Sequence, residues 1–143
     1  MGDSAELAED LRSVIGRLVR TVREVDTLAP GEAAVLGLVD REGPRTTAEV
    51  AQRRGVRHQS VAKSVKELVA EGLLATEAHP TDGRKLLLHL TEAGRERLDD
   101  ERRSRADKLA AAIDEDLTAA ERRDLERCVA LLSRLAGHVQ GKG

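Results

Sequence analysis

The feature that most constrains the fold is a run of two short amphipathic segments and a hairpin between residues 46 and 90. Thr46 and Glu49 begin the first segment with a capping-box pattern, in which each side chain satisfies the other residue's backbone N–H. Gly55 ends it, and the second segment, at about 58–71, carries apolar residues at i, i+4, i+7 and i+8. Two short helices separated by a tight turn at a glycine indicate a helix-turn-helix.

A β-hairpin is predicted directly after the second of these helices. Residues 73–78 and 85–90 have the composition of two short strands. The stretch between them, 79–83, contains a proline and an Asp-Gly pair, which favour a tight turn. A helix-turn-helix followed at once by a hairpin is a winged helix-turn-helix.

Long apolar stripes flank this lobe in three further predicted helices, at about 5–26, 92–113 and 119–138, and another helix starts at Pro30. The chain has no Phe, Trp or Tyr, so its core must be aliphatic. A long amphipathic helix must bury its stripe, and a second copy of the chain is the most economical partner. We therefore expect a mostly α-helical fold with a small β-hairpin wing, flanked by dimerisation helices. The expected division is 1–27 (N-terminal dimerisation helix), 28–98 (winged helix-turn-helix DNA-binding lobe) and 99–143 (C-terminal dimerisation helices).

The charge distribution suits a nucleic-acid partner although the net charge is -2. Residues 45–66 carry six Lys or Arg against one acidic residue. A local basic surface of this kind is the electrostatic pattern that phosphate contacts require. An ordinary solvated surface could have the same excess of basic residues. Charge alone therefore does not distinguish a nucleic-acid contact surface from a solvated one.

Taken in order, these segments resemble the MarR family of winged helix-turn-helix regulators. The matching run extends from Leu28 to Leu98 and is most distinctive in PTDGRKLLLHLTEAGRERL, where Asp82-Gly83-Arg84 resembles the family's D-x-R wing motif. The resemblance implies dimerisation through the terminal helices, major-groove recognition by the helix from His58, and minor-groove contact by the wing arginine. Two positions depart from the family pattern. Arg57 stands where the family often has a capping Ser or Thr, and Ala29 stands where a capping Thr is common.

The candidate DNA contacts come from three places in the lobe. At the start of the recognition helix, Arg57 and Gln59 can read guanine and adenine edges, with His58 beside them. In the wing, Arg84 is expected to enter a narrow minor groove, and Asp82 to orient it. The N-terminus of the helix before the turn can meet a phosphate. The full set is Arg57, His58, Gln59, Ser60, Lys63, Ser64, Asp82, Arg84, Lys85, Thr46 and Thr47.

Each of these assignments has a simpler alternative. The recognition-helix residues could form only a solvated face, and Asp82 and Gly83 could serve only the geometry of the turn. Capping alone explains Thr46 at least as well as a phosphate contact does.

Other functions find little support in the sequence. We see no glycine-rich phosphate loop and no nucleophile motif, and therefore expect neither an enzyme nor a cofactor. The four histidines are scattered without metal-site spacing, and Cys128, which lies near Leu125 and Val129, is expected to be a buried thiol. Without a signal peptide or a long apolar stretch, we expect a cytoplasmic protein with no membrane contact.

These observations predict a homodimer that binds a pseudo-palindromic promoter site in double-stranded DNA and represses transcription. The resemblance adds a small effector that binds between the lobe and the dimer helices and weakens DNA binding, in a pocket that must be aliphatic here. The alternative is a winged-helix protein-interaction module without specific DNA recognition, which would have no need of the basic face.

Overall fold

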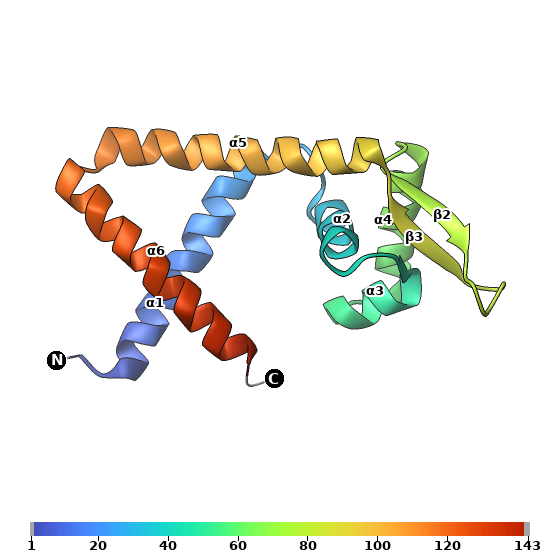
Figure 1. Ribbon diagram of the computed structural model, residues 1–143, viewed down its shortest axis with the longest axis horizontal. Helices are drawn as coiled ribbons and strands as arrows, with labels where there is room; N and C mark the ends of the chain where they lie inside the picture. The colour runs from blue at the N-terminus through green and yellow to red at the C-terminus, as the bar shows by residue number, and fades with distance from the viewer. Residues whose placement is uncertain (1, 142–143) are drawn as a thin grey trace. The chain divides into compact units, whose positions relative to one another are not determined.

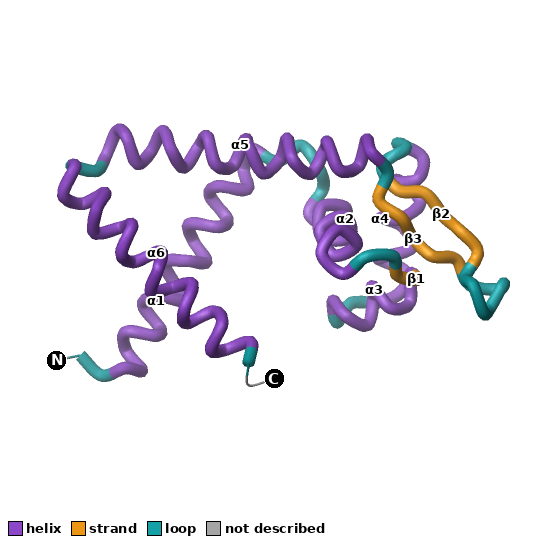
Figure 2. Tube along the Cα trace, viewed as in Figure 1, coloured by secondary structure: helices purple, strands orange, loops and turns teal. Residues whose placement is uncertain are grey.

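The computed structural model describes residues 2–141 and confirms the predicted winged helix-turn-helix class (Figures 1 and 2). Residues up to Arg105 form one compact unit, and those from Ala106 onward form a second. The elements are α1 (Ser4–Val22), η1 (Arg23–Val25), α2 (Pro30–Glu42), β1 (Arg45–Thr46), α3 (Thr47–Arg54), α4 (His58–Ala70), β2 (Leu74–Ala78), β3 (Leu86–Leu90), α5 (Glu92–Asp116) and α6 (Ala119–Gln140).

The core of the first unit is aliphatic, as the absence of aromatic residues requires. Its fully buried large side chains come from α2, α4 and the two long strands: Leu36, Leu68, Leu74 and Leu88. In Figure 1, α2, α3 and α4 gather beside the hairpin. Branched aliphatic side chains fill the space between these elements, and the polar faces of α3 and α4 are left toward solvent.

The helix-turn-helix forms as predicted, with one local difference. The Thr46 hydroxyl accepts a hydrogen bond from the Glu49 N–H at 3.2 Å and so caps α3. The Glu49 carboxylate pairs with Arg45 at 3.7 Å, so an ion pair takes the place of the reciprocal half of the predicted capping box. Gly55 then ends α3 in the left-handed conformation (φ 63°), which glycine adopts at little cost.

The sheet contains a strand that the sequence did not predict. Its order is β1-β3-β2, and both pairings are antiparallel. β1 is two residues long, too short for any alternation of apolar and polar side chains to be visible. Because Arg45 pairs with Leu88 and Thr46 with Leu87, this strand ties the start of α3 to the wing.

α5 starts in close contact with the sheet. The Thr91 hydroxyl accepts a hydrogen bond from the Gly94 N–H at 3.0 Å and donates one to the Gly72 carbonyl at 2.7 Å. A Cβ atom on Gly94 would lie 2.1 Å from the Leu73 carbonyl oxygen. Glycine is therefore required at this point of the LTEAG segment for steric reasons.

A buried carboxylate joins α5 to the segment between η1 and α2. Glu101 is 4% exposed, and it accepts hydrogen bonds from the Thr27 and Leu28 N–H groups at 2.9 and 3.0 Å. Both N–H groups precede α2, and that of Leu28, which is buried, would otherwise lack a partner. Glu101 therefore fixes where α5 lies against the start of α2.

Two surface ion-pair groups flank this contact. Asp26 accepts two hydrogen bonds from Arg105, and Asp40 accepts from both Arg95 and Arg102. The arginines hold the pKa values of both aspartates below the usual range, chiefly through these hydrogen bonds. Both carboxylates therefore favour the folded state more strongly above that range than in acid.

A pair of carboxyl groups links α2 to the end of α4. Glu32, 7% exposed, has a raised pKa, first because its carboxyl hydrogen-bonds to Glu67 and then because of burial and the negative charge of Glu71 and Glu67. Its side chain also accepts from the Ala29 N–H, which partly offsets this rise. Ala29, the N-cap residue of α2, has no side chain that can cap the helix.

The terminal helices leave their apolar stripes exposed. α1 ends four residues earlier than predicted, at Val22, and continues as η1, and α6 buries none of its residues. Cys128 on α6 is exposed, so the prediction of a buried thiol is wrong for the single chain, in which nothing covers this helix face. Within residues 2–141, no helix combines the length and apolar character that a membrane span needs.

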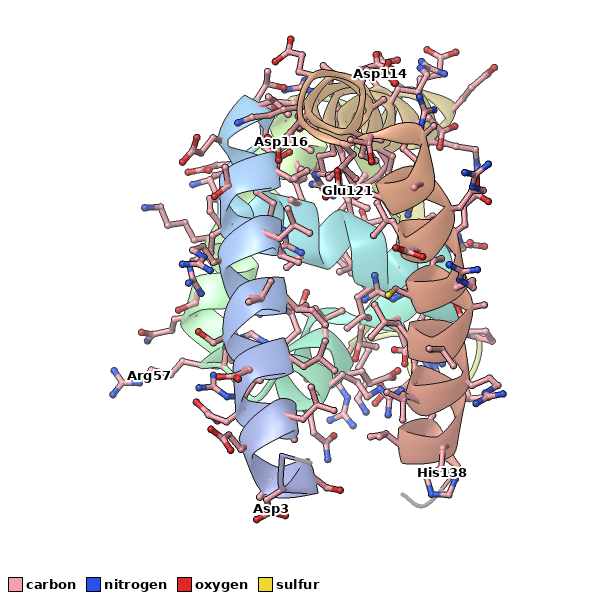
Figure 3. The ribbon with its side chains drawn as sticks, turned by 90° about the vertical axis from the view of Figure 1, so that its left-hand side faces the viewer. Asp3, Arg57, Asp114, Asp116, Glu121 and His138 are labelled. Carbon is pink, nitrogen blue, oxygen red and sulfur yellow. The ribbon has the colours of Figure 1, made fainter. Side chains whose placement is uncertain are left out.

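Local polar contacts hold the turn between α5 and α6, where Figure 3 labels Asp114 and Glu121. Thr118 and Glu121 form a complete capping box at the start of α6, and these hydrogen bonds lower the pKa of Glu121. Asp114 pairs with Arg122 across the turn at 3.1 Å.

We expect Glu101→Ala to lower the free energy of unfolding by about 2–4 kcal/mol, because it removes the charged acceptor of the buried Leu28 N–H and of the part-buried Thr27 N–H. Urea unfolding measured at fixed protein concentration checks this. Glu96→Ala removes an exposed carboxylate from the same helix and is the matched control. Equal stability of the two variants would contradict the proposed role of Glu101.

Glu32→Gln should stabilise the fold increasingly as the pH rises. A carboxyl whose pKa is raised on folding contributes stability below its unfolded pKa and loses that contribution as the pH passes its folded value. The wild type should therefore lose stability, relative to the variant, as the pH rises above the ordinary value of 4.5. Urea unfolding at several pH values, with the exposed Glu126→Gln as control, measures this, and a pH-independent difference would argue against a raised pKa of Glu32.

Candidate nucleic-acid interface

α4 presents one face to the core and the opposite face to solvent. Val61, Val65 and Leu68 are buried, whereas Val69, predicted on the same face, is partly exposed because it lies at the edge of the stripe. The predicted recognition residues Arg57, His58, Gln59, Ser60 and Lys63 are all exposed. In Figure 3 the Arg57 side chain extends away from the ribbon.

Arg57 occupies the N-cap position of α4 without capping it. Its backbone is extended (φ −68°, ψ 141°), and no side-chain hydrogen bond caps the helix there. Arginine has donors only, so it cannot accept from the first N–H groups of a helix. A Ser or Thr at this position would cap α4 but could not reach as far into solvent.

A groove of about 400 Å³ brings together the start of α3, one side of α4 and the wing. Thr47 lies at the first turn of α3, where N–H groups and the helix dipole attract anions. The groove is lined by Thr46, Thr47, Ala48, His58, Ala62, Val65, Lys66, Arg84, Lys85 and Leu86. Segments far apart in the sequence thus surround one basic concavity.

Lys66 lines this groove although it was not among the predicted contacts. It follows His58 by eight residues, close to two helical turns, so the two side chains lie on the same side of α4. The helical periodicity of α4 therefore already placed Lys66 on the same side as His58. The sequence could not show which side of α4 the wing covers, because that depends on tertiary packing.

Two predicted contacts turn inward. Thr46 is 6% exposed and its hydroxyl caps α3. The Ser64 hydroxyl donates to the Ser60 carbonyl at 3.3 Å, and a Cβ atom on Gly31 of α2 would lie 3.0 Å from it. The Thr46 side chain therefore caps α3, and the Ser64 side chain packs against α2.

The wing brings Asp82 and Arg84 together. The Asp82 carboxylate accepts hydrogen bonds from the Arg84 backbone N–H at 3.1 Å and from Arg84 Nε at 3.3 Å. These two hydrogen bonds hold the pKa of Asp82 below its usual range. The Arg84 side chain is 93% exposed, so an oriented guanidinium projects from the tip of the hairpin.

The structure also separates the exposed positive charges at the groove from arginines that pair or lie elsewhere. Arg53 pairs with Glu42 and Arg45 with Glu49, and Arg54 lines a different pocket. The exposed basic residues on or beside the groove are Arg57, Lys63, Lys66, Arg84 and Lys85. Asp82, the acidic side chain of the wing tip, is neutralised by Arg84.

A second pocket, of about 450 Å³, lies within the first unit between the α1–α2 linker, α2 and α5. The apolar part of the pocket lining is aliphatic, as the composition requires. The sequence did not predict the arginines that also line the pocket. The lining residues are Arg23, Asp26, Leu28, Pro30, Ala33, Ala34, Gly37, Leu38, Arg41, Arg54, Leu98, Arg102 and Arg105. In the part of the chain that the structure describes, no group of three His, Cys, Asp or Glu could hold a metal ion.

Comparison with known proteins agrees with this geometry. The family model described as MarR family matches residues 27–85, from the start of the lobe to the wing. An HTH-type transcriptional regulator from Mycobacterium bovis is 30% identical over 116 residues, which cover 79% of this chain and 81% of that protein.

Solved structures extend the similarity over nearly the whole chain. A transcriptional regulator from Pseudomonas aeruginosa has 31% identity and a TM-score of 0.80, and the match covers 93% of this chain and 94% of that one. Wild-type MarR from E. coli, at 19% identity, shares the fold with a TM-score of 0.64 over 92% of this chain and 98% of that one.

Arg57→Ser should raise the free energy of unfolding by roughly 0.5–1 kcal/mol, because a Ser hydroxyl at the N-cap accepts from a free N–H of α4. Arg57→Ala removes the same side chain without adding an acceptor and is the matched control. Chemical unfolding of the three proteins at equal concentration tests this. If Ser and Ala have the same effect, the start of α4 does not need a cap.

Proposed function

Because the chain belongs to the MarR family of transcriptional regulators, we propose that it binds a pseudo-palindromic promoter site in double-stranded DNA as a homodimer and represses transcription. As a member of this family it is a transcriptional regulator and not an enzyme. The observation that carries the proposal is the basic groove, in which the start of α3, the exposed side of α4 and the wing converge.

In the proposed complex, α4 lies in the major groove. Arg57 and Gln59 contact base edges, because a guanidinium pairs with guanine and an amide with adenine, and His58 lies beside them. Ser60, Lys63 and Lys66 contact the phosphate backbone, which supplies affinity without sequence information. Thr47 brings the N-terminus of α3 to a phosphate.

The wing contacts the adjacent minor groove. Arg84 is the inserted side chain, because a narrow minor groove concentrates negative potential that attracts a guanidinium. Asp82 orients Arg84 through the two hydrogen bonds described above and does not itself approach the anionic DNA. Lys85 contacts a phosphate beside it.

Dimerisation is proposed through the terminal helices, with residues 1–27 and 99–143 forming the dimer and 28–98 binding DNA. The support is the exposure of apolar side chains along α1 and α6, which a single chain leaves in water. The most exposed are Leu7, Val14, Leu18, Val19, Val129, Leu131, Leu135 and Val139. A two-fold dimer presents two copies of α4 and so matches an inverted repeat.

An effector is proposed for the aliphatic and arginine-lined pocket of the first unit. Its lining suits a small molecule that has both an apolar part and a negative charge. Such a ligand weakens DNA binding only if it binds better to a conformation that does not fit the operator.

Selection from randomised duplexes by the purified protein tests the proposal, with the affinity of the selected sites measured at several salt concentrations. An inverted repeat with half-sites about 10 bp apart and a steep salt dependence is expected. Light scattering should give twice the mass of one chain. Weak, salt-sensitive binding without an enriched sequence would instead favour a protein-interaction module.

Two variants then assign the contacts on the selected site. Arg84→Ala should weaken binding without unfolding the protein, and Gln59→Ala should relax the preference at defined base pairs by about 1–3 kcal/mol. Arg123→Ala, which removes an exposed arginine from α6, is the control. An equal loss on all sequences with Gln59→Ala would show that Gln59 contacts only the backbone.

A further inference from the structure

We propose that His79 is a positioning residue for DNA binding, whose imidazole folds the wing loop and, through Asp82, holds Arg84 in its binding orientation. This inference rests on the proposed function, because it assigns His79 through the proposed role of Arg84. It concerns a residue outside the groove and outside the set of predicted contacts.

His79 closes the base of the loop that joins β2 to β3. Its backbone N–H donates to the Lys85 carbonyl at 3.1 Å, across the loop. Its ring Nδ1 accepts from the backbone N–H groups of Thr81 and Asp82, each at 3.2 Å. Two consecutive N–H groups at the start of the turn thus share one acceptor, which also lies 3.3 Å from the Thr81 hydroxyl oxygen.

This arrangement sets the chemical requirement at position 79. Nδ1 must carry a free lone pair, so the neutral ring holds its proton on Nε2. Asn and Asp side chains make the same kind of bond to an N–H two residues ahead in Asx turns. His79 therefore takes the place of the Asn or Asp of an Asx turn, and the Asn Oδ1 atom is the closest substitute for its Nδ1.

A chain of hydrogen bonds leads from His79 to Arg84. His79 fixes the Asp82 N–H, and the Asp82 carbonyl accepts from the Lys85 N–H at 3.0 Å. The Asp82 carboxylate then holds Arg84 by its N–H and its Nε. Because Asp82 is bonded at its N–H, carbonyl and carboxylate, its orientation depends on the same turn that His79 closes.

Core packing does not hold this loop in place. A Cβ atom built on Gly83 meets no heavy atom within 4 Å, and the Arg84 side chain is almost fully exposed. Figure 2 shows the loop extending beyond the ends of the paired strands. The hydrogen bonds within the loop therefore determine its shape.

The consequence for DNA binding is preorganisation. A long exposed arginine loses rotamer freedom when it enters a groove, and this loss opposes binding. A loop that already holds the guanidinium near its bound position reduces that cost. Loss of the His79 acceptor should therefore weaken binding through Arg84 while the fold is retained.

The test uses the full chain and a duplex of the selected operator, with dissociation constants measured by fluorescence anisotropy. His79→Ala should weaken binding about 3–10-fold, the cost of one disordered long side chain. His79→Asn should restore near wild-type affinity. Thr76→Ala is the matched control, because it removes an exposed threonine hydroxyl from β2 and leaves the hydrogen bonds of His79 in place.

A double-mutant cycle with Arg84→Ala separates positioning from direct contact. His79→Ala should cause little further loss when Arg84 is already absent. An additive loss, or a His79→Asn variant as weak as His79→Ala, would overturn the proposal. If Arg84→Ala itself leaves affinity unchanged, the wing contact of the proposed function fails, and the positioning role fails with it.

A measurement without DNA checks the loop itself. In hydrogen-exchange NMR, the Thr81 and Asp82 amides should exchange slowly in the wild type and His79→Asn, and faster in His79→Ala. Equal exchange in all three proteins would refute the His79 hydrogen bonds. The melting temperature should be the same in each, because the loop carries no core side chain.

Discussion

The buried carboxylate of Glu101 is the contact on which the arrangement of the first unit depends. It supplies acceptors to Thr27 and Leu28, so the chain can leave η1, turn without exposing unpaired backbone groups, and start α2. The same contact places α5 against the start of α2, and the arginine pairs of Asp26 and Asp40 lie beside it. A hydrophobic contact would join these segments with less directional precision, because hydrogen bonds to two N–H groups define a position and an orientation together.

The C-terminal end of α4 lies against α2, and its N-terminal end is exposed to solvent. Its last turn carries Glu67, and Glu71 follows as the C-cap; both lie near buried Glu32 of α2 and raise the pKa of that residue. Its first turns carry the basic and amide side chains that remain exposed. Negative charge is thus confined to the end that packs, and positive charge to the groove. This separation explains how a chain with a net charge of -2 can present a basic surface to an anionic partner.

The wing and the terminal helices show two ways in which a small aliphatic protein leaves residues outside its core. In the wing, a tip without packing contacts is ordered by hydrogen bonds around His79 and Asp82. In α1 and α6, apolar side chains are exposed along whole helices, and only another surface can remove them from water. The first arrangement keeps a charged side chain accessible, and the second creates the driving force for association.

The sequence by itself determined the local features of this protein. Helical periodicity, Gly55 and the Asp-Gly turn predicted the helix-turn-helix and the hairpin, and the segment through Arg84 indicated the family. These signals are readable because each depends on residues a few positions apart. Tertiary structure alone decided which side of α4 meets the wing, so that Lys66 joins the groove while Ser64 packs against α2. It also decided that two residues before α3 form a strand, and that Glu101 lies beside Thr27, from which it is separated by more than 70 residues of chain. Such contacts leave no periodic trace in the sequence, because packing of the whole lobe brings their partners together.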